Sequence, residues 1–435
     1  MRQKLLRSGA DELSYEIRSI VRKAEFLKLS GKTIYWENIG DPIQKGRKLP
    51  DWMKAIISQS VLEDRTFGYS HSKGLLSTRE FLAARNNKLG GVQIEAEDIT
   101  FFNGLGDAIA KLYQYLLPTA RVIGPSPAYS THSSAEAAHA NTHPITYKLD
   151  PENQWLPDLD DMYLKVKYNS GIVGILVINP DNPTGMVYPR EILERIVETA
   201  EEFDLFLVFD EIYMNLVHQD MGTASMAEVI KEVPGISLKG ISKEIPWPGA
   251  RCGWAEYYNR KWNKEFERLC QTLDNAKMIE VSSTTLPQAI IPKVMGDTRY
   301  QVFLDDTNQA ISRRGDLLEK SFRDIPHIFF NKTKAAFYST IIFKADSLNN
   351  QQTLKIENEE HRDLVEQWVK GPGVSLDQRF VYYLLAAKGV CVVPVSSFCS
   401  DLLGFRITLL EEDEEKLRTI LNLVKEGILE YCASA

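Results

Sequence analysis

Cysteine is scarce in this chain, and no two cysteines form a CxxC pair. The five cysteines are odd in number and widely spread over 435 residues, which is typical of a reducing compartment and argues against a disulfide framework or a zinc site. The amino-terminal stretch MRQKLLRSGADEL is interrupted by charges and lacks the apolar core of a signal peptide. No apolar run is long enough to span a bilayer. We therefore expect a cytoplasmic protein with no metal site and no membrane partner.

An excess of basic residues is also missing. The formal net charge is −8, so the chain as a whole lacks the positive surface of a nucleic-acid-binding protein, and we expect no nucleic-acid partner. The composition is 44% hydrophobic and 25% charged, as in an ordinary globular protein. The length is sufficient for two domains.

Short apolar runs alternate with helical patterns between about residues 100 and 255. The run GIVGILVINP at 171–180 and the run LFLVFDEIY at 205–213 predict strands, and 189–203 predicts an amphipathic helix between them. Such alternation indicates an α/β fold with a mostly parallel sheet covered by helices, in which ligands bind beyond the carboxyl ends of the strands. After about residue 300, long helical patterns and short strands predict a smaller α+β domain.

A glycine turn, FFNGLGDAIAKL, occupies residues 101–112. Gly104 and Gly106 precede a predicted helix whose free N–H groups are suited to hold an anion. Ile109 stands where a GxGxxG dinucleotide fingerprint has its third glycine, which argues against a nicotinamide-dependent dehydrogenase. A tight strand-to-helix turn without a ligand remains the alternative.

Two further motifs follow predicted strands. In NPDNPTG (179–185), two Asn–Pro pairs impose extended and turn geometry and hold the asparagine amides rigidly. In VFDEIY, Asp210 ends an apolar strand, where a partly desolvated carboxylate needs a cationic partner, and Tyr213 lies three residues on. The alternative is that Asp210 is a helix N-cap and Tyr213 a core residue.

The stretch ISKEIPWPGARCGW (241–254) carries Lys243 and Arg251 in a turn too rich in proline and glycine to be a helix. The arginine fork suits a phosphate, and a lysine in a partly apolar site loses pKa and becomes a nucleophile. A lysine, a carboxylate and an anion site are the groups that pyridoxal phosphate requires. Two separate surface cations are the alternative.

The motifs NGLGDAI, PAY, NPDNPTG, FDEIY, SKEIPWPGARCGW and FRITL occur in this order over nearly all of the chain. The set resembles the class I/II aminotransferases, which are fold-type I pyridoxal-phosphate-dependent enzymes. The resemblance implies a large domain with a mostly parallel seven-stranded sheet between helices, a smaller α+β domain, and a homodimer with shared active sites. We expect an N-terminal arm and part of the small domain at 1–50, the large coenzyme-binding domain at 51–300 and the C-terminal small domain at 301–435.

The resemblance also implies roles for individual residues around the coenzyme ring. Lys243 matches the Schiff-base lysine that later moves protons, and Asp210 matches the partner of the ring nitrogen. Tyr213 and Asn182 match the residues that bind the 3-oxygen of the ring, with Asn182 also on the substrate side. Tyr129 matches the aromatic residue that stacks on the ring.

Further positions are matched at the phosphate and at the substrate. The phosphate-binding set comprises the side chains of Arg251 and Ser242 and the backbone of Leu105 and Gly106. Tyr69 matches the tyrosine that reaches the phosphate in the partner subunit. Arg406 matches the arginine that binds the substrate carboxylate, and Gly40 matches a glycine on the substrate side.

The implied activity is transfer of an amino group between an L-amino acid and a 2-oxo acid by a ping-pong mechanism. A pyridoxal-phosphate-dependent lyase or decarboxylase on the same fold is the alternative. A non-catalytic binding protein is a further alternative, but intact Lys243, Asp210 and Arg251 argue against it. Dicarboxylate-specific relatives add an arginine from the partner subunit. Its expected region here, 275–288, contains only Lys277, which favours an alanine-like, aromatic or broad specificity.

Three positions depart from the family pattern. Gly240 stands where a serine is frequent, three residues before Lys243, and His132 stands where many relatives have tyrosine. Trp247, in the insert 244–248, either lines the substrate pocket or packs in the core.

Overall fold

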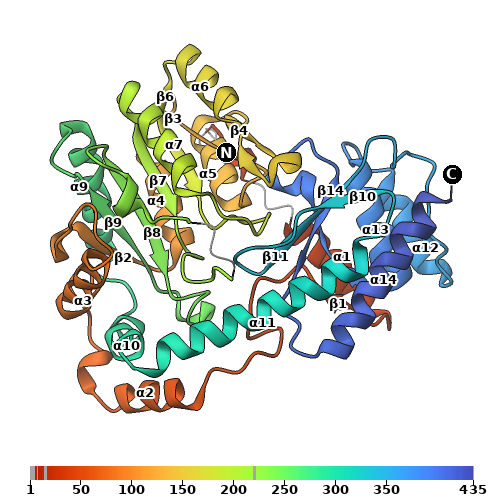
Figure 1. Cartoon of the computed structure of the whole chain (residues 1–435), viewed down its shortest axis with the longest axis horizontal. Coiled ribbons are helices and arrows are strands. Elements are labelled where there is room, and N and C mark those ends of the chain that lie inside the picture. The colour runs from red at the N-terminus through yellow and green to blue at the C-terminus, as the bar shows by residue number, and fades with distance from the viewer. Residues whose placement is uncertain (1–4, 7, 14–16, 219–221, 435) are drawn as a thin grey trace.

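The computed structural model describes residues 5–6, 8–13, 17–218 and 222–434, and its larger part is built on one eight-stranded sheet (Figure 1). In sheet order the strands are β2 (Ile99–Phe102), β9 (Gly253–Tyr258), β8 (Gly235–Gly240), β7 (Phe206–Asp210), β6 (Ile172–Ile178), β3 (Arg121–Ser126), β4 (Thr146–Asp150) and β5 (Leu156–Pro157). Strands β8, β7, β6, β3 and β4 run parallel, whereas β9 is antiparallel to both of its neighbours. The predicted mostly parallel sheet is confirmed. The two-residue β5, antiparallel to β4, adds an eighth strand at the edge.

Both faces of this sheet are covered by helices, because successive side chains of a strand point to opposite faces. In β7, Phe209 joins the core on one face and Val208 joins the core on the other. The first face is covered by α7 (Arg190–Glu202), which confirms the helix predicted at 189–203. The second face is covered by α4 (Leu105–Gln114) and α9 (Lys264–Ile279).

A smaller antiparallel sheet lies beside the large one (Figure 1). Its strands, in sheet order, are β10 (Ile328–Phe330), β11 (Tyr338–Phe343), β14 (Gly404–Thr408) and β13 (Val393–Pro394). Its helices are α12 (Glu359–Val369), α13 (Leu376–Lys388) and α14 (Glu414–Cys432). The long helix α11 (Arg299–Phe322) runs from the region of the large sheet to the smaller one.

The amino-terminal segment packs against this smaller part. Strand β1 (Tyr35–Trp36) pairs in parallel with β12 (Val390–Cys391), and α1 (Ile17–Leu29) precedes it. The remaining helices are α2 (Asp51–Val61), α3 (Leu76–Asn87), α5 (Ser130–Ala140), α6 (Leu159–Tyr168), α8 (Met226–Val229) and α10 (Thr285–Met295).

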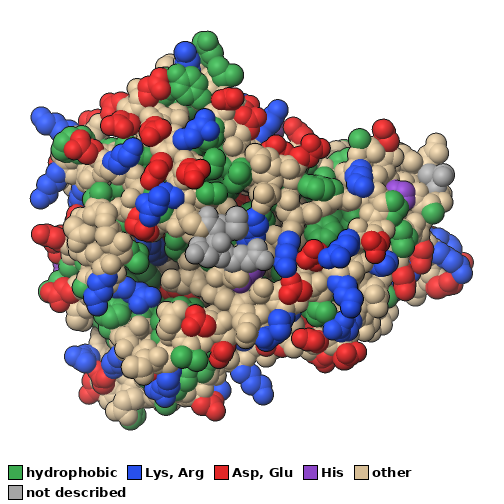
Figure 2. Space-filling model, in the orientation of Figure 1, with side chains coloured by type: hydrophobic (Ala, Val, Ile, Leu, Met, Phe, Trp, Pro, Cys, Tyr) green, Lys and Arg blue, Asp and Glu red, His purple; other side chains and the backbone are tan. Residues whose placement is uncertain are grey.

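The surface in Figure 2 carries lysine and arginine side chains interspersed with aspartate and glutamate, so this face shows no broad region of a single charge sign. Among the described residues, no helix combines the length and the apolar character needed to cross a membrane.

Candidate active site

Residues from both sheets meet around a cavity of about 1010 Å³. Asp210 ends β7, and Asn182 and Lys243 lie on the loops that follow β6 and β8. This placement follows from the parallel sheet, since loops after parallel strands gather at one edge. All of the predicted site residues except Tyr69 line the cavity. They are Gly40, Leu105, Gly106, Tyr129, Asn182, Asp210, Tyr213, Ser242, Lys243, Arg251 and Arg406.

Lys243 is the one lysine among the described residues that line this cavity. Its Nζ donates a hydrogen bond to the carbonyl oxygen of Gly40 at 2.7 Å. Burial lowers the pKa of Lys243 to about 8, and the positive charge of Arg406 acts in the same direction, against the negative charge of Asp41. A lysine with this pKa is partly neutral near pH 8, so its amine is available as a nucleophile or a base.

Two other lysines considered from the sequence lie outside the cavity. Lys239, on β8, forms ion pairs with Glu256 at 2.8 Å and with Glu211 at 3.5 Å. Lys277 is fully buried and forms an ion pair with Asp107 at 3.1 Å. Both ammonium groups are therefore engaged within the core of the chain.

The Asp210 carboxylate is buried at the end of β7. Its Oδ1 accepts a hydrogen bond from the backbone N–H of Ile212 at 3.2 Å, and its Oδ2 lies 3.0 Å from Nε2 of His132. His132 belongs to the first turn of α5, one turn after Tyr129. In the sequence, His132 stands out only as a departure from the family pattern. Its position three residues after Tyr129, about one helical turn, is the signal that relates it to the cavity. An N–H on Nε2 stabilises the ionised carboxylate.

The NPDNPTG loop is held by its own polar side chains. Oδ1 of Asn179 accepts from the backbone N–H of Tyr188 at 2.9 Å. Asp181 accepts from the Thr184 hydroxyl at 2.5 Å, and burial raises the pKa of Asp181 to about 7. Asn179 and Asp181 therefore shape the loop, while Asn182 is the member that faces the cavity.

The amino-terminal end of α4 forms an anion-binding corner of the cavity. The N-cap Gly104 provides no side chain to cap the helix, so the first backbone N–H groups are available to a ligand. A Cβ on Gly104 would lie 2.3 Å from Nη2 of Arg251, which shows how closely the guanidinium packs on this turn. Ser242 lines the same cavity.

Arg406, on β14, is fixed at another wall of the cavity. Its Nη1 donates to Oδ1 of Asn182 at 3.0 Å and its Nη2 donates to the carbonyl oxygen of Asn38 at 2.7 Å. The guanidinium lies between the rings of Tyr338 and Phe398, 4.4 and 5.0 Å from their centroids. Its buried Nε has no hydrogen-bond partner in the part of the chain that the structure describes.

Gly40 lies between Lys243 and the smaller sheet. A Cβ at this position would be 2.2 Å from the hydroxyl of Tyr338, so the close approach requires glycine. The preceding Glu37 is buried, where it accepts from Lys45 at 2.5 Å and from the Thr408 hydroxyl at 2.9 Å. These bonds attach the Gly40 segment to β14.

Tyr338 is a cavity residue that the sequence analysis missed. Its hydroxyl lies 2.9 Å from the hydroxyl of Tyr213, and burial raises the pKa of Tyr213 well above its usual value. Tyr338 sits in the run AFYSTIIF beside Ser339 and Thr340, and no local pattern distinguishes its hydroxyl as a cavity group.

Two aromatic residues of the sequence analysis do not line the cavity. Tyr69 is 85% exposed and lies between the amino-terminal helices α2 and α3. Trp247 is partly buried and packs against the core, while its neighbour Pro248 faces the cavity. Of the two alternatives for Trp247, the packing role is the one observed.

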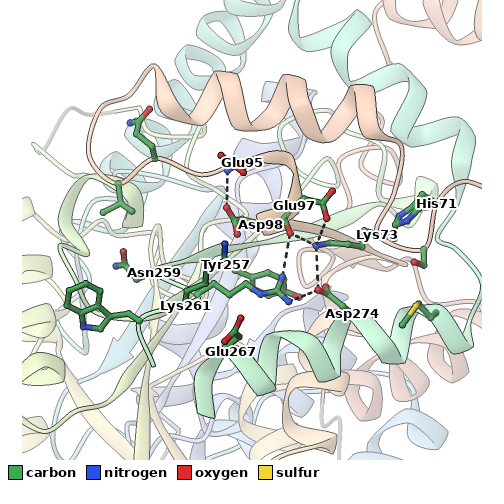
Figure 3. A pocket seen from close by; sticks show the side chains of 16 residues that line it. His71, Lys73, Glu95, Glu97, Asp98, Tyr257, Asn259, Lys261, Glu267 and Asp274 are labelled. Atoms are coloured by element: carbon green, nitrogen blue, oxygen red, sulfur yellow. Dashed lines mark hydrogen bonds and ion pairs between the residues drawn. The ribbon is translucent and has the colours of Figure 1, made fainter. Parts of the chain in front are cut away.

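A second cavity of about 810 Å³ contains none of the predicted residues (Figure 3). Several of its charged groups are paired with one another. Lys73 approaches Asp274 at 3.5 Å and Glu97 at 3.5 Å, and Arg260 pairs with Asp274 at 3.0 Å. We assign no site there.

Residues 38–423 match the family described as aminotransferase class I and II. The chain belongs to this family. The aminotransferase is 53% identical, over 99% of both chains, to an uncharacterized aminotransferase of Methanocaldococcus jannaschii. It is 29% identical to the glutamate-pyruvate aminotransferase AlaA of Escherichia coli over 76% of this chain and 80% of the relative.

Solved structures share the fold of this aminotransferase. The alanine aminotransferase from Pyrococcus furiosus superposes with a TM-score of 0.83 at 25% identity, covering 98% of this chain and 100% of that one. An aminotransferase from Escherichia coli has a TM-score of 0.85 at 24% identity over 99% of both chains.

Aminotransferases of this class depend on pyridoxal phosphate, and the residues of the cavity fit that group. The coenzyme carries an aldehyde, a ring nitrogen and a phosphate. The cavity offers an amine of lowered pKa on Lys243, a buried carboxylate on Asp210, and helix N–H groups beside Arg251. The substrates of such an enzyme are an amino acid and a 2-oxo acid.

Proposed function

We propose that this aminotransferase moves an amino group between glutamate and pyruvate, with the chain's own residues in the roles given below. The observation that carries the proposal is that Lys243, Asp210 and Arg406 face one cavity. The names of two relatives, a glutamate-pyruvate aminotransferase and an alanine aminotransferase, supply the substrate pair.

The coenzyme is held by groups of complementary charge. Lys243 would bind it covalently through Nζ, and Asp210 would pair with the ring nitrogen, while His132 keeps the Asp210 carboxylate oriented. Tyr213 and Asn182, which line the cavity, would hold the 3-oxygen of the ring, and Tyr129 would contact its face. The phosphate would be held by Arg251, Ser242 and the backbone N–H groups of Leu105 and Gly106. When bound, pyridoxal phosphate supplies an electron sink for the substrate's α-carbon.

Proton transfer and orientation belong to Lys243 and Arg406. The Lys243 amine would take the α-proton of the substrate as a general base and would later return a proton as a general acid. A pKa of about 8 suits both steps near neutral pH. Arg406 binds the substrate carboxylate bidentately and so orients the bond that loses its proton, with Gly40 leaving room beside it.

We further propose that the enzyme is a cytoplasmic homodimer in which Tyr69 reaches the partner's coenzyme phosphate. The stretch 61–76, which contains Tyr69, carries several exposed apolar side chains, as expected of a surface that pairs with a second copy. They are Val61, Leu62, Phe67 and Leu76. The five cysteines are free, as in a reducing compartment. The division into an arm at 1–50, a large domain at 51–300 and a small domain at 301–435 stays a proposal.

The test is the visible spectrum of the holoenzyme during addition of single amino acids. We expect glutamate and alanine to convert the lysine-bound coenzyme to its amine form, and pyruvate or 2-oxoglutarate to restore it. A protein that responds to amino acids with ammonia or carbon dioxide release and never yields the amine form would contradict the proposal. Light scattering of the same sample, with Tyr69→Ala as a comparison, tests the dimer.

A further inference from the structure

A cavity of about 280 Å³, which we call the α3 cavity, lies between α3, the carboxyl end of α10 and the loops that follow β7 and β8. None of the residues assigned to the coenzyme or the substrate lines it. Its wall includes Glu211 and Glu244, the sequence neighbours of Asp210 and Lys243, and Ile212 lines this cavity and the active-site cavity alike. Ligand pockets have volumes of about 300–1,000 Å³, so a cavity of this size suits a small molecule.

Glu244 is a buried carboxylate that lacks an ion pair. The residue is 6% exposed, and it forms no ion pair with any residue that the structure describes. Its Oε2 accepts a hydrogen bond from the amide of Asn215. Burial raises the pKa of Glu244, and that hydrogen bond and the positive charge of Arg85 oppose the rise only in part. Because an unpaired carboxylate in the interior is costly, a cationic ligand group beside Glu244 would stabilise the protein.

Arg85 and Asn86, on α3, present unused donors to the same cavity. Arg85 packs on the ring of Tyr300, 5.8 Å from its centroid, and has neither an ion pair nor a hydrogen bond within the described part of the chain. Asn86 is 4% exposed, and its Oδ1 accepts from Lys239 at 3.2 Å. Because an ammonium group only donates, the atom facing Lys239 is the amide oxygen. The buried Nδ2 is then the donor left without a partner, and a carboxylate would suit it and Arg85 together.

The other charged groups of the α3 cavity leave nothing for a ligand to satisfy. Lys239 pairs with Glu256 at 2.8 Å and with Glu211 at 3.5 Å. Lys88 is exposed to solvent. The groups that remain are one carboxylate, on Glu244, and the donors of α3.

We propose that the α3 cavity binds a small neutral amino acid as a zwitterion, with its ammonium group at Glu244 and its carboxylate at Arg85 and Asn86. Arg85 and Glu244 line the same cavity without pairing with each other, and a ligand that carries both charges on neighbouring atoms complements both. Much of the remaining wall is apolar, which favours a methyl-sized apolar side chain over a charged one. Its apolar residues include Leu82, Leu89, Met214 and Met295.

The probe for this site is 2-aminoisobutyrate, a zwitterion with two methyl groups and no α-proton, so the enzyme cannot transaminate it. Its binding to the holoenzyme is followed by calorimetry and by the coenzyme absorbance together. Binding in the active-site cavity alters the coenzyme and is seen by both methods, whereas binding in the α3 cavity is seen by calorimetry. We expect calorimetry to give one more bound molecule for each chain than the absorbance does. The titration requires no turnover, so its result is independent of the substrate pair proposed above.

Two analogues and two variants test the assigned contacts. N-acetyl-2-aminoisobutyrate lacks the ammonium charge and 2-aminoisobutyramide lacks the carboxylate, and we expect neither to fill the additional site. Glu244→Gln and Arg85→Gln are each expected to weaken the additional binding about tenfold or more, as for loss of a charge-assisted hydrogen bond. The absorbance titration changes less than twofold in both variants. Glu80→Gln, which removes a charge from an exposed position of α3 outside the cavity, matches wild type.

Three results would overturn the inference. Equal numbers of bound molecules from calorimetry and absorbance would show that no second site exists. Additional binding that persists in both variants, or that either analogue shares, would show that the ligand is not held as a zwitterion by these residues. Equal weakening of the calorimetric and the absorbance-detected binding would show that Glu244 and Arg85 act on the active site and not on a separate ligand.

Discussion

A substitution at Gly104 is the most direct test of the anion-binding corner at the amino-terminal end of α4. Its φ of +83° and ψ of 164° place it in a region of backbone geometry that is nearly restricted to glycine. In Gly104→Ala, the new Cβ would lie 2.3 Å from Nη2 of Arg251. The substitution therefore displaces the guanidinium without removing it.

The magnitude follows from that distance. Restoring an ordinary contact of 3.4 Å requires the guanidinium to move by about 1 Å. A misplacement of that size is sufficient to lose a charge-assisted hydrogen bond to phosphate, worth roughly 1.5–3 kcal/mol. At about 1.4 kcal/mol for each factor of ten, we expect pyridoxal phosphate to bind about 10- to 100-fold more weakly. Backbone strain of about 1–3 kcal/mol is expected to lower the stability of the apoenzyme as well.

The assay is titration of the apoenzyme with pyridoxal phosphate, followed by the absorbance of the bound coenzyme. Gly249→Ala is the matched control, because Gly249 lies two residues before Arg251 and a Cβ there meets no atom within 4 Å. We expect this control to bind as wild type does. If Gly104→Ala is folded and binds the coenzyme within about twofold of wild type, the assignment of Arg251 to the phosphate is wrong.

Three further predictions concern the reacting groups. Lys243→Ala abolishes turnover, whereas Lys239→Ala retains covalent capture of the coenzyme but loses roughly 3–5 kcal/mol of stability, because Glu256 is left without its ion-pair partner in the core. Borohydride trapping with peptide mapping identifies the lysine that captures the coenzyme, and urea unfolding measures the loss of stability. Trapping on Lys239 would reverse the assignment. Asp210→Asn keeps the coenzyme bound but slows the half-reaction by about 10²- to 10³-fold in stopped-flow measurements, and a loss below about threefold would rule out its role at the ring nitrogen. Because the pKa of Lys243 is lowered from 10.5 to about 8, the unfolded chain binds more protons than the native apoenzyme between these values, so the stability of the apoenzyme rises with pH across that interval. The rate of coenzyme attachment rises up to pH of about 8 and then levels off, and a rate still climbing at about pH 9.5 would contradict this pKa.

The principal chemistry was predictable because it is local in the sequence. Strands and helices can be predicted from hydrophobic periodicities of two and 3.6 residues. Asp210 lies at the end of one such strand, and Lys243 lies shortly after another. The loops that follow parallel strands lie at one edge of the sheet, so the proximity of Asp210 and Lys243 follows from the topology alone. The spacing of Lys243 and Arg251 separated the site lysine from Lys239, which the structure shows paired with Glu256.

Other features depend on how distant segments pack, and no local pattern contains that information. Tyr338 and Tyr213 are 125 residues apart, yet their hydroxyls meet. Trp247 lies within the motif that supplies Lys243, but it turns to the core.

The sequence by itself determined the fold class and the family, because both depend on residue types at fixed short spacings. The coenzyme-binding groups that it predicts rest on the same spacings and stay a prediction. Only the tertiary structure decided which residues of the amino-terminal segment line the cavity. Arg22 shares no motif with Lys243 and Arg406, and it reaches the same cavity because α1 packs its apolar face against the core. Residues from distant segments come together in this way because whole helices and sheets pack against one another. The order of residues within one segment does not reveal that packing.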